Sequence, residues 1–323
     1  MSRHRALVTA PLRGPGLDRL GELADVVFDP WIDHRPIRLY RAAELAARLE
    51  EISADLLVCE ADDCRGPVFE QPLVAVASTR GDPTNVDVAA ATAADIPVLH
   101  APGRNADAVA EMAVALALAV NRHVVAGDRD MRTGRVFGDT IPYQRYRAWQ
   151  LAGRTVGLVG LGAVGRAARW RFEGLGMTTM ACDPYQPDAD SSLEEVLATA
   201  DVVSMHAPAN AETAGMIGAD QFASMRPGAI YVNTARAALH DTEALVAALE
   251  SGHLGGAGLD HVTGETLPDD HPLTRLDNVV LTPHVGGATY DTEVNQTDMV
   301  VEDIARVLAG QRPHRLANPE VWL

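Results

Sequence analysis

The sequence predicts an α/β protein with doubly wound, mainly parallel sheets. Two features predict this class. Short apolar runs alternate with segments of helical spacing along most of the chain, and a glycine-rich turn, GLGAVG at residues 160–165, separates one such run from a helical segment. Strands joined through helices pair in parallel, because the crossover returns the chain to the same edge of the sheet.

The expected strands fall into two series. The first comprises residues 5–10, 25–30, 55–60 and 73–79, with a helix expected at 41–52. A long apolar helix follows at 108–120; it is too short to span a bilayer. The second series comprises residues 155–160, 178–183, 201–207, 229–235, 256–261 and 278–284. A further long helical pattern covers residues 291–310.

Helix starts are visible in the second series. Ser191 followed by Glu194 predicts a capping box, and Asp241 is the expected N-cap of a helix that Gly252 stops. Residues 123–150 are rich in Arg, Tyr and Trp and lack a regular pattern. We expect an irregular arm there, which either contacts a second subunit or packs as a surface loop.

Composition excludes several classes of partner. The 323 residues include 44 acidic and 27 basic side chains, for a formal charge of −17, which repels nucleic acid and anionic membranes. Three sparse cysteines without metal-like spacing predict reduced thiols in a cytoplasm and no metal site. The first residues lack the continuous apolar core of a secretory signal.

The glycine-rich turn predicts a dinucleotide site. Gly160 permits the tight turn, Gly162 lets the backbone approach a pyrophosphate, and Gly165 lets helix and strand pack closely, as in a Rossmann domain. The helix N-terminus would hold the phosphates despite the acidic charge of the chain. Asp183 ends the next strand, where a carboxylate binds the adenosine ribose and repels a 2′-phosphate. We therefore expect NAD rather than NADP.

Three polar residues follow other strand ends: Arg236, Glu265 and His284. Ligands of open α/β sheets bind beyond the carboxyl ends of the strands. Hydride transfer to a carbonyl needs a proton donor, a task that suits His284. Glu265 beside it would favour the imidazolium, and the Arg236 fork would bind a carboxylate.

With these residues in place, the chain resembles the D-isomer-specific 2-hydroxyacid dehydrogenases, in particular their phosphoglycerate dehydrogenase-like branch. The resemblance runs from about residue 75 to residue 289. It is carried, in order, by GRNADAVAE, VGLVGLGAVGR, SMHAP, MRPGAIYVNTAR, the stretch from Asp260 to Glu265, and LTPHVGGAT. It implies a smaller, discontinuous, flavodoxin-like substrate domain (1–101 and 291–323) and a Rossmann NAD domain (102–290).

By this resemblance, Arg236, Glu265 and His284 are the catalytic Arg, Glu and His of an NAD-dependent enzyme that interconverts a D-2-hydroxy acid and its 2-oxo acid. Substrate contacts would fall on Arg80, Gly81, Asn105 and Arg236. The implied cofactor contacts, beyond Gly160, Gly162, Gly165 and Asp183, are Ala163, Val164, His206, Ala207, Thr213, Thr234, Ala235, Arg236, Asp260, and His284 with Gly286 and Gly287. The resemblance also implies a homodimer.

Departures from the family pattern leave the substrate open. His261 stands where the family usually has an apolar residue, and it either faces the site or packs beneath it. The loop at Arg80–Gly81–Asp82 differs from the commoner glycine-valine-glycine loop. Glu60, Asp62 and Asp63 would disfavour a phosphorylated substrate unless Arg65 or Arg80 compensates. Two alternatives remain: a formate dehydrogenase-like enzyme, against which Glu265 argues, and a non-catalytic NAD-sensing protein.

Overall fold

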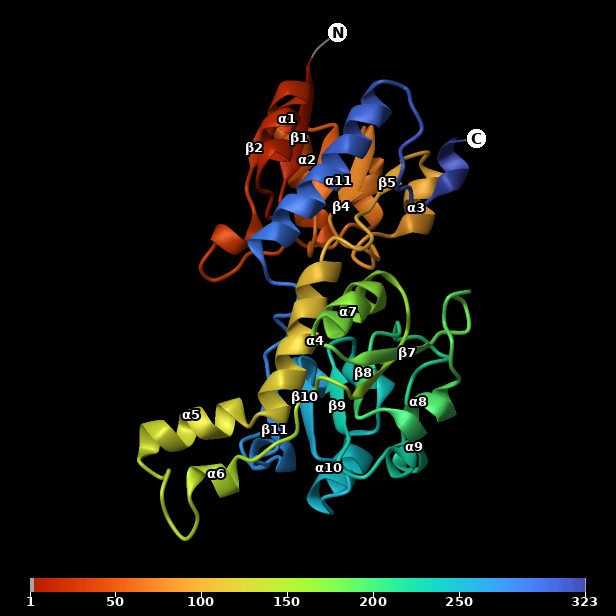
Figure 1. Ribbon diagram of the computed structural model, residues 1–323. Helices are drawn as coiled ribbons and strands as arrows, with labels where there is room; N and C mark the ends of the chain where they lie inside the picture. The colour runs from red at the N-terminus through yellow and green to blue at the C-terminus, as the bar shows by residue number, and fades with distance from the viewer. Residues whose placement is uncertain (1–2, 323) are drawn as a thin grey trace. The chain divides into compact units, whose positions relative to one another are not determined.

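The computed structural model describes residues 3–322, which divide into two compact units (Figure 1). Unit 1 extends to Asn105 and resumes at Thr289, and unit 2 is Ala106–Ala288. The boundaries expected from the sequence, 101/102 and 290/291, lie within a few residues of these. Each unit contains one sheet in which every strand pair is parallel.

Unit 1 has a five-stranded sheet in the order β2-β1-β3-β4-β5. This is the flavodoxin-like order, with the reversal of strand order between β1 and β3. Its elements are β1 (His4–Val8), α1 (Pro15–Leu23), β2 (Ala24–Phe28), η1 (Trp31–Asp33), α2 (Ala42–Ile52), β3 (Leu56–Cys59), η2 (Gly66–Glu70), β4 (Ala75–Ser78), α3 (Val88–Ala93), β5 (Val98–Leu99), α11 (Tyr290–Leu308) and η6 (Pro319–Trp322).

The sheet of unit 1 is covered on both faces, because its strands are apolar on both sides. One core cluster joins the sheet to α1 and α11, and a second joins it to α2 and η2. The chain after α11 returns to the edge strand β5, where the Asn318 side chain accepts from the Val98 N–H at 2.8 Å and the Ala317 N–H donates to the Val98 carbonyl. This pairing covers an otherwise open sheet edge.

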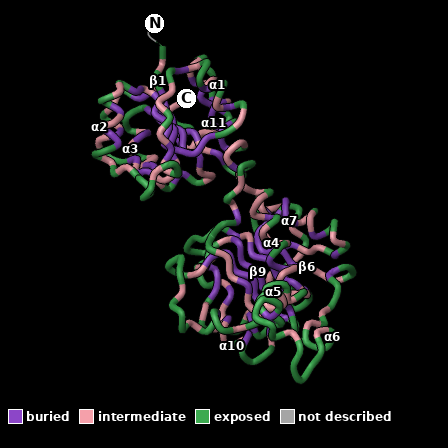
Figure 2. Tube along the Cα trace, turned by 90° about the vertical axis from the view of Figure 1, so that its left-hand side faces the viewer, coloured by how far each residue is buried: buried purple, intermediate pink, exposed green. Residues whose placement is uncertain are grey.

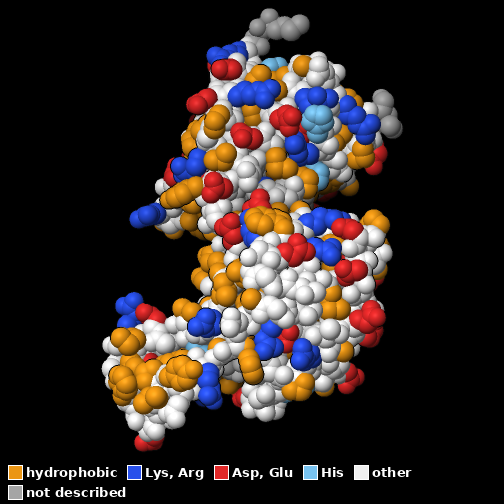
Figure 3. Space-filling view, in the orientation of Figure 1, with side chains coloured by type: hydrophobic (Ala, Val, Ile, Leu, Met, Phe, Trp, Pro, Cys, Tyr) orange, Lys and Arg blue, Asp and Glu red, His pale blue; other side chains and the backbone are white. Residues whose placement is uncertain are grey.

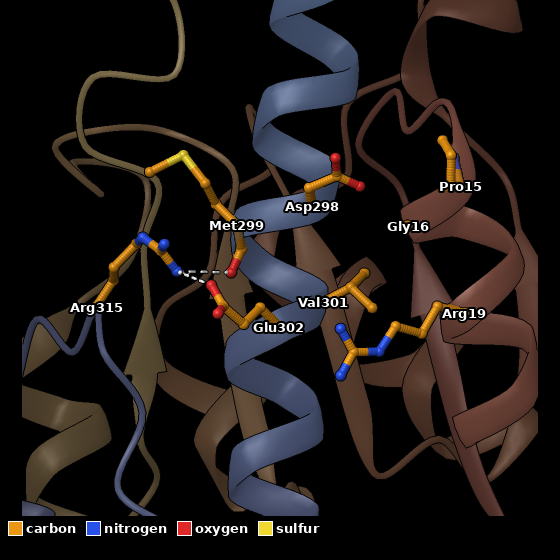
Figure 4. A pocket seen from close by; sticks show the side chains of 8 residues that line it. All are labelled: Pro15, Gly16, Arg19, Asp298, Met299, Val301, Glu302 and Arg315. Carbon is orange, nitrogen blue, oxygen red and sulfur yellow. Dashed lines mark hydrogen bonds and ion pairs between the residues drawn. The ribbon is translucent and has the colours of Figure 1, made fainter.

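A cavity of about 370 Å³ lies against α1 and α11 in unit 1 (Figure 4). Its lining includes two guanidinium groups. Arg315 is bonded to Glu302 and to the Met299 carbonyl, while the Arg19 side chain projects from α1 toward α11. None of the residues expected to carry chemistry lines this cavity.

Unit 2 has a six-stranded sheet in the order β11-β10-β9-β8-β6-β7. The chain passes from β6 outward to β7 and then back across to β8, so the strand order reverses between β6 and β8. Its elements are α4 (Ala106–Asn121), α5 (Val124–Thr133), α6 (Pro142–Arg145), β6 (Thr155–Val159), α7 (Ala163–Gly174), β7 (Thr178–Cys182), α8 (Leu193–Thr199), β8 (Val202–Met205), α9 (Ala219–Ser224), β9 (Ile230–Asn233), η3 (Ala237–Leu239), α10 (Thr242–Glu250), β10 (Gly256–Leu259), η4 (Thr263–Glu265), η5 (Pro272–Thr274) and β11 (Val279–Leu281).

Helices cover both faces of this sheet as well. One core cluster packs α4 and α7 against the strands, and the other packs α8, α9 and α10 against the opposite face. The inner strands β6 and β9 therefore lie among buried residues (Figure 2). Strands buried on both faces appear in the sequence as continuous apolar runs, which is why they were recognisable.

Two local expectations were wrong. The capping box of α8 is formed by Ser192 and Glu195, one residue later than expected, and the Ser192 hydroxyl accepts from the Glu195 N–H at 3.1 Å. The expected irregular arm contains a ten-residue helix, α5, which is followed by the single turn of α6. Half of the α5 residues are polar, and its apolar residues Val124, Val125 and Met131 are exposed, so no buried apolar face marks this helix in the sequence. The expected N-cap Asp241 is confirmed, because its side chain accepts from the Ala244 N–H.

Within residues 3–322, no single helix has the length and apolar character needed to cross a membrane. Only the pair α4 and α5, bent by 58° between them, reaches that length and composition together.

Candidate active site

The turn between β6 and α7 has the form that a pyrophosphate needs. Gly160 has φ +98°, in the region that favours glycine, and its N–H donates to the Cys182 carbonyl at 2.9 Å. A Cβ on Gly165 would lie 2.2 Å from the Gly160 oxygen, so the start of α7 packs directly on the turn. A Cβ on Gly162 would meet nothing within 4 Å. The side of the turn at Gly162 is therefore open to a ligand, at the N-terminus of a twelve-residue helix whose first residues are Ala163 and Val164.

Asp183 follows β7 directly and lies beside this turn. One carboxylate oxygen accepts from the Leu161 N–H at 2.8 Å, and the other accepts from the Tyr185 N–H at 2.9 Å. These two backbone bonds fix the carboxylate beside the glycine turn. Asp183 is about twenty residues from the glycine motif in the sequence, and the fold brings the two into direct contact.

Beyond β8 and β9, two polar atoms are buried without a hydrogen-bond partner among residues 3–322. They are Nδ1 of His206 and the hydroxyl of Thr234. Burial lowers the pKa of His206 to about 4, so its ring is neutral at pH 7; Nε2 contacts the Ser204 hydroxyl at 3.0 Å. Buried polar atoms normally have partners. Two such orphans at the same sheet edge as the glycine turn fit a site for a large polar cofactor.

A buried hydrogen-bond network holds the loop that carries Arg236. The Asn233 amide donates to the Arg236 carbonyl at 2.9 Å and accepts from the Ala235 N–H. The same amide lies 3.0 Å from Nδ1 of His240, a buried ring that the Tyr231 hydroxyl also approaches. The guanidinium of Arg236 donates to the Ala235 carbonyl at 2.6 Å and, among residues 3–322, forms no ion pair with a carboxylate. It is thus available to an anionic ligand.

Asp260, at the end of β10, organises the loop that follows β11. Oδ1 accepts from the Thr282 hydroxyl at 2.6 Å and from the Val285 N–H at 3.0 Å, and Oδ2 accepts from the Gly286 N–H at 2.7 Å. The side chain is buried, and a Cβ on Gly286 would lie 2.8 Å from Oδ2. His284 is held in the middle of this loop. Asp260 therefore fixes where the His284 backbone lies.

The His284 ring meets Glu265 from the neighbouring loop. Nδ1 of His284 lies 3.1 and 3.2 Å from the two carboxylate oxygens of Glu265. Both residues have positive φ, +54° for His284 and +63° for Glu265, a conformation that is uncommon outside glycine. Such strained backbone clusters at functional sites. With Nδ1 directed at the carboxylate, Nε2 is the ring nitrogen left to a substrate.

His261 packs against His284 and lies next to Arg236. Its ring centroid is 3.6 Å from that of His284, and its Nε2 is 3.5 Å from Nη1 of Arg236. Burial, His284 and Arg236 together lower the pKa of His261 to about 4. His261, Glu265 and His284 offer ligand atoms within 4.8 Å of one another, but the adjacent guanidinium opposes a metal cation there.

Three of the expected substrate contacts, Arg80, Gly81 and Asn105, lie in unit 1. Arg80 and Gly81 form the loop after β4, where the Gly81 carbonyl contacts Nδ1 of His100 at 2.8 Å. The Arg80 carbonyl accepts from the Ala101 N–H, and Asn105 precedes α4. These residues belong to a different unit from His284 and Arg236.

The acidic stretch after β3 does not present the free negative charge that the sequence suggested. Glu60 pairs with Arg104 at 2.6 Å. Asp62 is buried, accepting from the Thr9 hydroxyl and the Tyr40 N–H. Asp63 pairs with Arg65. The stated exception, compensation by an arginine, therefore applies to Glu60 through Arg104 and to Asp63 through Arg65, so these two carboxylates carry no argument against a phosphorylated substrate.

The fold and the unit 2 site together define a dinucleotide-dependent oxidoreductase: a doubly wound sheet with a glycine turn at its switch point, and a His, Glu and Arg at the same edge. The protein-family model for the NAD binding domain of D-isomer specific 2-hydroxyacid dehydrogenases matches residues 114–286 of the sequence. The chain belongs to this family and is an NAD-dependent oxidoreductase.

Individual relatives agree with this assignment. A glyoxylate reductase of Thermofilum pendens is 36% identical over 99% of this chain and 96% of that protein. A D-3-phosphoglycerate dehydrogenase of Archaeoglobus fulgidus is 36% identical over 70% of this chain and 44% of that protein. The crystal structure of the TT0316 protein of Thermus thermophilus has a TM-score of 0.82 and 38% identity, covering 97% of this chain and 99% of that one.

The structure also brings forward residues that the sequence did not identify. Asn233 and His240 support the Arg236 loop, and Thr282 completes the bonds of Asp260. A polar residue inside an otherwise apolar strand, such as Asn233 in IYVN, was the only available signal. The remaining expected cofactor contacts, Ala207, Thr213, Ala235 and Gly287, all follow the carboxyl ends of strands in unit 2.

Proposed function

We propose that the chain reduces a 2-oxo acid to the D-2-hydroxy acid with NADH, and catalyses the reverse reaction with NAD. In this proposal His284 and Glu265 form the proton relay, and Arg236 binds the substrate carboxylate. The observation that carries it is the contact of His284 Nδ1 with Glu265 beside an arginine that has no carboxylate partner in the described part of the chain.

The cofactor supplies the hydride that adds to C2 of the 2-oxo acid, or removes it from the hydroxy acid. His284 donates its Nε2 proton to the carbonyl oxygen as the alkoxide develops, and takes a proton back in oxidation. Glu265 orients the ring through Nδ1 and stabilises the imidazolium by charge. One proton and one hydride are thus consumed for each 2-oxo acid reduced.

Arg236 recognises the carboxylate that every substrate of this class shares. Its fork presents several N–H donors, of which one is used by the Ala235 carbonyl. Asn233 anchors the Arg236 backbone carbonyl, and the Ala235 carbonyl accepts from the guanidinium itself. We propose Arg80, Gly81 and Asn105 as further substrate contacts, on the strength of the resemblance that identified them.

The orphaned polar atoms support the proposed NAD contacts. Nδ1 of His206 and the Thr234 hydroxyl each lack a hydrogen-bond partner in the described part of the chain, and bound cofactor would supply one. Asp183 would accept from the adenosine ribose, as its carboxylate lies beside the glycine turn. A 2′-phosphate at that position would meet a negative charge instead.

The test is turnover with a panel of 2-oxo acids, starting with glyoxylate, in both directions and with NADH and NADPH. His284→Ala should lower kcat by roughly 10²–10⁴-fold while NADH binding, followed by fluorescence, is kept. Glu265→Gln should give a smaller loss, because the amide keeps a hydrogen bond but not the charge. NADH binding without turnover of any acid would favour the NAD-sensing alternative, and oxidation of formate would favour the formate dehydrogenase alternative.

We also propose that the chain forms a homodimer through the arm of α5 and α6. Large apolar side chains gather on this arm (Figure 3) and are exposed: Val124, Val125, Met131, Phe137, Ile141, Tyr143 and Trp149. Exposed apolar clusters of this kind mark association surfaces. Phe137→Ser with Tyr143→Ser should shift the mass measured by light scattering from two chains to one; a monomeric wild-type chain would refute the proposal. The three unpaired thiols, Cys59, Cys64 and Cys182, favour a reducing cytoplasm as its location.

A further inference from the structure

The proposed mechanism assigns no task to His261, a titratable side chain in contact with both His284 and Arg236. It follows Asp260 directly and is only 4% exposed. A buried imidazole is costly unless its polar atoms have partners, and an apolar residue at this position would avoid that cost. The question is therefore what an imidazole does here that an apolar side chain would not.

The protonation state of His261 limits its possible roles. Burial lowers its pKa to about 4, with His284 and Arg236 acting in the same direction against the weaker opposing effects of Asp260 and Glu265. The ring is therefore neutral at pH 7, with one nitrogen protonated and one free to accept. A neutral ring adds no third positive charge beside Arg236 and a protonated His284.

The contact with Arg236 decides which nitrogen accepts. A guanidinium has donors only, so Nε2 of His261, 3.5 Å from Nη1 of Arg236, must be the acceptor and Nδ1 must carry the proton. The same Nη1 donates to the Ala235 carbonyl at 2.6 Å. These two acceptors hold one end of the guanidinium, which leaves its other donors free for a carboxylate.

The His261 ring also packs against the His284 ring. The two ring centroids are 3.6 Å apart with the planes inclined by 50°. The His284 side chain is 44% exposed and contacts Glu265 through Nδ1 alone. His261 therefore supports the buried side of a ring that would otherwise turn about its bonds more freely.

We propose that His261 is a positioning residue, whose neutral imidazole accepts from Arg236 and packs against His284, so that the carboxylate-binding and proton-donating groups keep a fixed mutual orientation. This inference rests on the proposed function, since it assigns His261 a task in the same reaction. Because an apolar side chain could replace the packing but not the acceptor, the main effect of its loss falls on substrate carboxylate binding.

The experiment compares His261→Leu with His261→Gln in the full-length chain. Leucine keeps the bulk and removes the acceptor, while glutamine places an amide oxygen near the position of Nε2. With glyoxylate and NADH, His261→Leu should raise KM roughly 10-fold and change kcat less than about 3-fold, the size expected for one hydrogen bond to a charged group. Binding of oxamate, an unreactive 2-oxo acid analogue, should weaken by a similar factor. His261→Gln should recover most of both losses, and the affinity for NADH should stay unchanged in both variants.

A pH profile separates positioning from proton transfer. As His261 is neutral from pH 5 to 8, removing it should leave the ionisations seen in kcat/KM in that range in place. Loss of one of those ionisations in His261→Gln would make His261 itself the proton donor and overturn the inference. Equal KM and oxamate binding in wild type and His261→Leu would also overturn it. The proposed function fails separately, if wild type turns over no 2-oxo acid or if His284→Ala is fully active.

Discussion

Gly165→Ala is the sharpest test of the glycine turn, since it adds a single methyl group at the point of closest packing. The new Cβ would lie 2.2 Å from the Gly160 carbonyl oxygen and 3.1 Å from the Gly160 carbonyl carbon. Both are backbone atoms, so no side chain can rotate away. The start of α7 or the turn itself must move by about 1 Å to restore an ordinary contact of more than 3 Å.

The loss of folding stability caused by the added methyl group can be estimated from other overpacked interiors. Extra methyl groups in a well-packed interior destabilise proteins by about 1–3 kcal/mol, and a clash with backbone belongs at the upper end. For a domain of 150–250 residues, 1 kcal/mol corresponds to about 2–4 °C in Tm. We therefore expect Tm to fall by roughly 6–12 °C and NADH binding to weaken as the turn moves.

Gly162→Ala is the matched control for Gly165→Ala, because it adds the same methyl group to the same turn at a position with open space. Its φ is −72° and its Cβ would meet nothing within 4 Å. We expect an unchanged Tm but weaker NADH binding, as the methyl group would occupy the open side of the turn. Thermal melts and NADH fluorescence titrations of both variants measure the two effects. A Gly165→Ala protein that melts like wild type would refute the packing argument, and tight NADH binding by Gly162→Ala would refute the assignment of that face to the pyrophosphate.

Three further predictions concern the carboxylates and a buried histidine of unit 2. Asp183→Ala should lower the preference for NADH over NADPH by roughly 10-fold in kcat/KM, and no change would remove Asp183 from cofactor selection. Asp260→Ala should leave three donors unpaired, reducing Tm by several degrees and kcat by more than 10-fold, whereas Thr282→Val, which removes one of the three, should cost only about 1 kcal/mol. Burial lowers the pKa of His240 to about 4, below its unfolded value of about 6.5. The unfolded chain therefore binds the proton first, so stability is full above pH 6.5 and falls by up to about 3 kcal/mol as pH drops to 4. His240→Gln should flatten this part of a Tm-against-pH curve, and an unchanged slope would contradict the burial argument.

The strand ends were predictable, and with them most of the candidate site. Strands buried on both faces appear as apolar runs, and each run ends where a polar residue leaves the sheet. Asp183, Arg236 and His284 could all be located in this way, since the carboxyl ends of parallel strands share one edge, whereas Asp260 came from the family resemblance. The family motifs then supplied the roles that position alone does not give.

Loops and side-chain orientation could not be predicted in the same way. The sequence placed His261 next to Asp260 but left open whether it faces the site, because that depends on how the chain turns after β10. It also gave no sign that Glu60 pairs with Arg104 or that Asp62 accepts from the Thr9 hydroxyl, since both partners are distant in sequence. The helix α5 could not be predicted because most of its residues are polar or exposed. Apolar residues therefore do not recur at helical spacing along it.

The contact between His284 and Glu265 depends on a backbone conformation that the sequence alone does not predict. Both residues adopt positive φ, which costs non-glycine residues about 1–2 kcal/mol each. Nothing in the local sequence favours that conformation, so it has to be imposed from outside the two loops. For His284 the constraint is visible: Asp260, from a different strand, binds the Thr282 hydroxyl and the Val285 and Gly286 N–H groups on either side of it. The geometry of the proton relay is therefore set by a buried carboxylate that precedes it by more than twenty residues, and only the fold connects the two.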